Sequence, residues 1–207
     1  MSAKARPRIR PLHLPADHHT RHIATLEQRS KAYIESCIAI PARGALLDPL
    51  PAILDHIAAA DVVLNTGHIS GPEAVRLVEM ARRRGVRRIL VPASHYSKDE
   101  VSALTDLDAM VEFSFFFVSH ATQAGLTHVD AERHTVPPVP LPVMVELIRA
   151  ATPERSLVNS DGGVFLLPPP VEALREFLLL LESAGFSRDE LRIMSHTNPG
   201  RLFRVGR

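Results

Sequence analysis

The chain has 207 residues, 45% of them hydrophobic, and its 24 Lys and Arg residues nearly balance 23 Asp and Glu residues. This composition is typical of a folded globular protein and excludes an intrinsically disordered chain. A formal net charge of +1 gives no general attraction to nucleic acid or to anionic membranes. We therefore expect a single domain over residues 1–207, with neither a nucleic-acid nor a membrane partner.

The N-terminal region contains no recognisable targeting signal. Its basic residues lead into a Pro- and His-rich stretch instead of the apolar segment of a signal peptide; they are Lys4, Arg6, Arg8 and Arg10. We expect residues 1–8 to form a flexible arm and the protein to be cytoplasmic. The lone Cys37 cannot form an internal disulfide, which agrees with a reducing compartment.

The hydrophobic pattern predicts strands that alternate with helices. A first strand is expected over 9–14, followed by a long active-site connection over 18–47 and a helix over 49–60. The clearest segment is 61–92, where an apolar strand, a helix that ends at Gly85 and a second apolar strand form one βαβ unit.

Capping boxes predict where three helices begin. In each of them a Ser is followed three residues later by a Glu: Ser70 with Glu73, Ser97 with Glu100, and Ser187 with Glu190. The first of these helices ends with Arg82, Arg83 and Arg84, which we interpret as a solvated helix end.

The second half of the chain continues the alternation. Strands are expected over 109–118 and 156–160, and a Pro-rich, extended link over 137–142. Further helices are expected over 143–151, 171–184 and 187–194. This order favours an α/β fold with a parallel sheet of about five strands and flanking helices.

Ligand-type side chains follow three of the predicted strands where each strand ends: His68, His95 and Asp161. Because the carboxyl ends of parallel strands meet at one edge of a sheet, we expect these side chains to lie close together. Two neutral imidazoles and a carboxylate suit Zn²⁺, with Mn²⁺ or Fe²⁺ as alternatives. Each residue can also be explained as an ordinary hydrogen-bonding turn residue.

Five further residues are candidates for contacts with a small-molecule substrate: His13, Asp17, His18, Glu112 and His120. Glu112 lies in an apolar segment, where an ionised carboxylate is costly unless it is paired or bound to a metal. Asn159 is expected to support the site through hydrogen bonds, without contacting a substrate.

At these positions the sequence resembles the amidohydrolase superfamily, metal-dependent hydrolases that fold as TIM barrels. The resemblance covers residues 63–70, 85–91 with His95, 157–163, and the closing segment Asn198-Pro199-Gly200-Arg201-Leu202-Phe203. It implies that His68 and His95 are metal ligands or substrate contacts. It also implies that Asp161 is a metal ligand and the general base.

The sequence departs from that superfamily in two respects. It shows about five strands where a closed barrel has eight, and it lacks the His-x-His pair of the first barrel strand. We therefore expect a partial (β/α) TIM-type barrel. Its open sheet edges should be covered by a second copy of the chain or by another polypeptide.

These observations lead to two functional predictions. The first is a metal-dependent hydrolase that cleaves a C–N or C–O bond with a metal-activated water, with zinc as the expected ion. The alternative is a catalytically inactive barrel fragment that serves as a binding or assembly module.

Overall fold

A computed structural model describes residues 20–41, 43–124, 135–163 and 166–205. Four strands form one parallel sheet in the order β1-β2-β3-β4: β1 Val63–Asn65, β2 Arg88–Pro92, β3 Met110–Ser114 and β4 Ser156–Asn159. This confirms the predicted α/β fold with a parallel sheet. The strand expected over 9–14 lies outside the described residues.

The helices alternate with the strands along the chain. They are α1 Arg21–Leu26, α2 Lys31–Ser36, α3 Leu50–Ala60, α4 Gly71–Arg83, α5 Lys98–Asp106, α6 Phe115–Val118, α7 Leu141–Ala151, α8 Pro170–Ser183, α9 Arg188–Arg192 and α10 Asn198–Phe203. A π-helical turn, Ile193–Thr197, joins α9 to α10. In the described part of the chain, no helix is long and apolar enough to cross a membrane.

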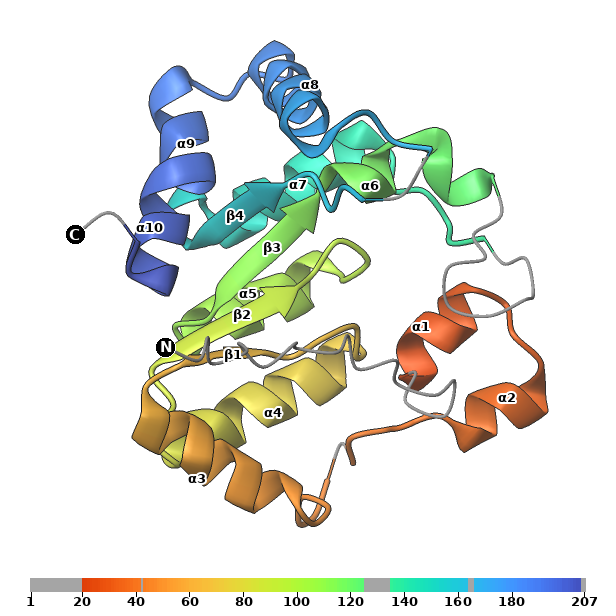
Figure 1. The fold of residues 1–207 in the computed structure, drawn as a ribbon, viewed down its shortest axis with the longest axis vertical. Coiled ribbons are helices and arrows are strands. Elements are labelled where there is room, and N and C mark those ends of the chain that lie inside the picture. The colour runs from red at the N-terminus through yellow and green to blue at the C-terminus, as the bar shows by residue number, and fades with distance from the viewer. Residues whose placement is uncertain (1–19, 42, 125–134, 164–165, 206–207) are drawn as a thin grey trace, which may run out of the picture.

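The sequential strand order places the crossover helices on one face of the sheet. Right-handed crossovers that always advance in the same direction leave their helices on the same side. Accordingly α4 packs against α5, and α5 packs against α7 (Figure 1). A doubly wound sheet, by contrast, reverses direction and carries helices on both faces.

The two faces of the sheet differ in character. Under the crossover helices, Ile89, Val111 and Phe113 are almost completely buried in the main core. On the opposite face, Leu90 and Leu157 pack against Leu202 of α10. Figure 1 shows α10 beyond the amino ends of the strands and α1 and α2 beyond their carboxyl ends.

All three predicted capping boxes are present, at the starts of α4, α5 and α9. The Glu73 carboxylate of the first box also accepts a hydrogen bond of 2.8 Å from the Ile40 backbone nitrogen. It thereby ties the connection over 18–47 to α4. That connection, for which the sequence predicted no helix, contains α1 and α2, which begin at the side-chain caps Thr20 and Ser30.

The prediction of a single strand over 109–118 was wrong. The apolar segment 109–118 is not one strand, because β3 ends at Ser114 and the helix α6 follows. Ser114 pairs with Asn159, the last residue of β4, so a longer β3 would have no ladder partner there. The helical turn satisfies the backbone and buries three consecutive Phe side chains.

The Arg run at the end of α4 is not simply solvated. The Arg82 guanidinium donates to the carbonyl oxygens of Val86, Arg87, Leu107 and Asp108, at 2.6–2.9 Å. These bonds join the end of α4 to the loop before β3. Sequence spacing could not reveal the acceptors, because two of them come from a separate segment.

Asn198 anchors the C-terminal helix to the sheet. The residue is 1% exposed, and Nδ2 donates to the carbonyl oxygens of Pro153 and Ser156, both at 2.8 Å. We expect Asn198→Ala to lower the free energy of unfolding by about 2–3 kcal/mol, because two buried carbonyls lose a donor. Urea denaturation would measure this. The matched Ser183→Ala change removes an exposed hydroxyl and should be nearly neutral; an equal effect of both changes would contradict the anchoring role.

Candidate functional site

The predicted strand-end residues lie at the same edge of the sheet. His68 follows β1, His95 follows β2 and Asp161 follows β4, each within three residues of the strand end. After β1 the chain turns through Gly67, whose φ of 66° favours glycine, and the Gly67 nitrogen donates to Asn65 Oδ1 at 2.9 Å. Parallel strands therefore place these side chains at one edge, but only His68 and His95 line a common pocket.

His22, His68 and His95 line one small pocket, together with Tyr96 and Phe117. The Phe117 ring lies edge-on to both strand-end imidazoles, with centroid separations of 6.0 Å to His68 and 4.6 Å to His95. His22 comes from α1, which is held here by the Thr20 hydroxyl donating to the His68 carbonyl oxygen. Sequence reasoning did not include His22 in the site, because its place depends on how α1 docks.

Burial favours the neutral form of all three imidazoles. Partial burial lowers the pKa of His68, and the nearby Asp161 carboxylate opposes that shift. Burial lowers the pKa of His95 and of His22 as well, and the neighbouring imidazoles reinforce the effect. Neutral imidazoles can accept a hydrogen bond or ligate a metal, which imidazolium cannot do.

The tautomer of His95 follows from its hydrogen bond. Its Nε2 lies 2.9 Å from the carbonyl oxygen of Pro137, and a carbonyl oxygen can only accept. Nε2 therefore carries the hydrogen, and in the neutral ring Nδ1 holds the free lone pair. The Pro-rich link over 137–142 thus has a role that was not anticipated, since it fixes this ring.

Glu112 is the most perturbed carboxyl group at this edge. Burial, with a smaller contribution from the negative charge of Asp161, raises the pKa of Glu112 to about 7. Its carboxyl accepts a hydrogen bond from Asn159 Nδ2, across from β4. Asn159 Oδ1 is buried and has no hydrogen-bond partner among the described residues. With a pKa of about 7, the Glu112 carboxyl group is therefore partly protonated at neutral pH.

The charge of Asp161 acts on both the histidine pocket and the Glu112–Asn159 pair. The residue is exposed, and its φ of 49° places it in the left-handed region. Its charge raises the pKa values of both His68 and Glu112, so the three groups share one electrostatic environment. Two carboxyl groups in different surroundings are the usual arrangement for acid and base catalysis.

The described residues do not form a complete metal centre. Within them, no three His, Cys, Asp or Glu side chains are placed to hold one ion. His68 and His95 have the chemistry of metal ligands, but neither His22 nor another described side chain is placed to bind the same ion with them. His120 lies in a short 3₁₀-helix and does not line the histidine pocket, and His13, Asp17 and His18 lie outside the described residues.

Fold and site together define an α/β protein with a singly wound parallel sheet and a polar, titratable cluster at its carboxyl edge. A family described as "Family of unknown function (DUF6282)" matches residues 2–132, more than half of the chain. The chain belongs to this family. The match includes His68, His95 and Glu112 but ends before β4 and Asp161. A comparison with curated proteins gave no match.

Proposed function

We propose that the protein is a hydrolase that cleaves a C–N or C–O bond at the carboxyl edge of its sheet. The observation that carries this proposal is the pair of unlike carboxyl groups, Glu112 with a pKa of about 7 and the exposed Asp161, whose charge acts on it. The resemblance to the amidohydrolase superfamily points to the same reaction class.

In the proposed reaction, Asp161 acts as base and Glu112 as acid. Asp161 accepts a proton from the water that attacks the carbonyl carbon, and a C–O bond forms. As the C–N or C–O bond to the leaving group breaks, protonated Glu112 donates its proton to the leaving atom. Proton exchange with solvent then restores both carboxyl groups.

The neutral histidines position the substrate in this proposal. A substrate hydroxyl or amide can donate to the free Nδ1 of His95, while Phe117 supplies an apolar wall against both rings. The resemblance also implies a zinc ion, or manganese or iron, held by His68, His95 and Asp161. Because the described residues lack a three-ligand centre, none of the steps above uses a metal.

A substrate panel over a range of pH tests the proposal. The purified protein would be assayed against amides, lactones and cyclic ureides. We expect kcat/KM to fall as pH rises through about 7, because Glu112 then loses the proton that it must donate. A rate that increases through this range would exclude Glu112 as the acid.

Chelation separates the metal-dependent form of the proposal from the metal-independent one. Activity that EDTA abolishes and zinc restores would support the centre implied by the resemblance. Elemental analysis of the His68→Ala, His95→Ala, Asp161→Ala triple variant would then show whether these residues hold the ion. Activity that is insensitive to EDTA would leave the carboxyl pair as the catalytic groups.

A second candidate is a binding or assembly module without catalysis. Its support is the sheet itself, in which β1 and β4 each pair on one side only within the described residues. Unpaired strand edges invite a partner, either a second copy or another chain. Light scattering would detect such an assembly. A stable monomer that hydrolyses no member of the panel would exclude self-assembly and leave the binding of another molecule as the role of the module.

A further inference from the structure

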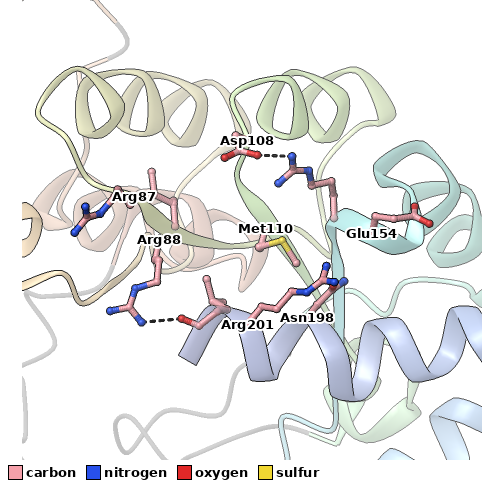
Figure 2. Close-up of a pocket in the computed structure, with 10 residues that line it drawn as sticks. Arg87, Arg88, Asp108, Met110, Glu154, Asn198 and Arg201 are labelled. Carbon is pink, nitrogen blue, oxygen red and sulfur yellow. Dashed lines mark hydrogen bonds and ion pairs between the residues drawn. The ribbon is translucent and has the colours of Figure 1, made fainter. Parts of the chain in front are cut away.

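A second cavity lies at the opposite, amino-terminal edge of the sheet. It has a volume of about 200 Å³ and lies between the starts of the strands and α10. Four arginines line it: Arg87, Arg88, Arg155 and Arg201 (Figure 2). Drug-sized ligands occupy pockets of about 300–1,000 Å³, so this cavity suits a smaller molecule.

The charges around the cavity favour an anion. Its lining contains two carboxylates, Asp108 and Glu154, against the four guanidinium groups. Asp108 is already engaged, since it pairs with Arg82 at 3.6 Å and also with Arg155. Figure 2 shows the Glu154 carboxylate directed away from the other labelled side chains. Arg87 and Arg88 also pair with Asp61, which lies outside the lining and pairs with Arg204 as well, so guanidinium groups still outnumber carboxylates. An entering anion would therefore meet a net positive surface.

Arg201 has no ionic partner among the described residues. Within the described part of the chain it makes no hydrogen bond or ion pair, although it lines the cavity. Figure 2 shows its side chain extending past Met110 toward Asn198. Because Asn198 is buried and anchors α10, the backbone that carries Arg201 is fixed relative to the sheet.

Arg88 supplies a second donor, its Nε, which makes no hydrogen bond to another described residue. Its side chain is 17% exposed, and Nη1 donates to the Leu202 carbonyl oxygen at 2.9 Å, which orients the guanidinium. Its Nε is buried without a hydrogen-bond partner among the described residues. The nearest carboxylate oxygen, Asp61 Oδ1, lies 3.6 Å away, beyond hydrogen-bond distance. A buried charged donor of this kind is costly unless a ligand or water satisfies it.

We propose that this cavity binds the phosphate group of a small phosphomonoester. Arginine forks match the oxygens of phosphate, and a dianion would offset the excess positive charge. The apolar side chains of Ile89, Met110 and Leu202 complete the lining and suit a short carbon skeleton. This site is separate from the carboxyl edge and does not depend on the proposed hydrolase activity.

Isothermal titration calorimetry on the full chain tests the proposal, with inorganic phosphate and glycerol 3-phosphate as probes. We expect a Kd on the order of 1 mM or tighter for phosphate, measured against sodium chloride of equal ionic strength. Tighter binding of glycerol 3-phosphate would support a phosphomonoester. Equal or weaker binding of glycerol 3-phosphate would overturn the phosphomonoester and indicate free phosphate as the ligand. The absence of binding by either probe would overturn the site itself.

Arginine variants locate the binding. Arg201→Gln should weaken phosphate binding by about tenfold or more, because a charge-assisted hydrogen bond is lost, and its exposed position should leave the fold intact. The matched control is Arg83→Gln, an exposed arginine at the end of α4 that does not line the cavity. Equal weakening by both changes would overturn the proposal, since binding would then follow net charge alone.

Discussion

Replacing Asp161 by Asn is expected to lower kcat by about 10²–10⁴-fold on any substrate that the protein hydrolyses, the usual contribution of a positioned base. Asn cannot accept the proton of the attacking water. The fold should survive, because φ at this position is 49° and Asn tolerates the left-handed region better than most residues. Steady-state kinetics and the circular dichroism melting curve would measure the two effects separately.

The same variant has a consequence that does not depend on finding a substrate. Asp161 raises the pKa of His68, so its neutralisation should lower that pKa further, as an NMR titration would show. Asp106→Asn, which removes an exposed carboxylate at the end of α5, serves as the control and should leave His68 unchanged. Full turnover in Asp161→Asn would exclude the residue as the base.

Replacing Glu112 by Gln is expected to remove the fall in activity near pH 7 and to lower kcat/KM by about 10²–10⁴-fold, because Gln cannot donate a proton to the leaving group. The amide should fit the site well. Its oxygen can accept from Asn159 Nδ2, and its nitrogen can donate to the buried Asn159 Oδ1, which otherwise lacks a partner in the described structure. A pH–rate profile of the variant beside that of the wild type would test this.

Glu112 should also make the stability of the protein depend on pH. Its ordinary pKa is 4.5, and in the folded protein it is about 7, so between these values the native state holds a proton that the unfolded state has lost. Unfolding then releases a proton, and stability falls as pH rises through this window. The Gln variant lacks this loss, and its advantage should grow by about 2–3 kcal/mol between about pH 5 and pH 8.

Urea denaturation at several pH values would measure that advantage. Glu176→Gln changes an exposed carboxyl on α8 and should follow the wild type at every pH. A constant difference between wild type and Glu112→Gln across this range would contradict the raised pKa. It would also remove the main support for Glu112 as the acid.

Much of the fold could be predicted from local patterns. The strands at Val63–Asn65 and Arg88–Pro92 follow from short apolar runs, and the intervening helix follows from its capping box and from the left-handed stop at Gly85. These signals are local, since a cap or a Gly acts within one turn of the chain. The apolar run through Ser114 was misassigned because periodicity does not show where a neighbouring strand ends.

The candidate site was predictable only in outline. The sequence indicates that His68, His95 and Asp161 follow parallel strands, which is enough to place them at one edge. It does not indicate that His22 reaches the same pocket from α1, or that Asn159 donates to Glu112 from the next strand. These contacts join segments that are far apart in the chain, and no short-range spacing encodes them.

By itself, the sequence determined the class of fold, the positions of most helices and strands, and the edge at which the ligand-type residues collect. These features depend on hydrophobic periodicity, caps and the chirality of βαβ units, which act over short distances. Only the tertiary structure decided that the pKa of Glu112 lies near neutral and that Arg201 has no partner among the described residues. Both properties depend on desolvation and on charges brought close by folding, and neither depends on a residue's neighbours in the chain.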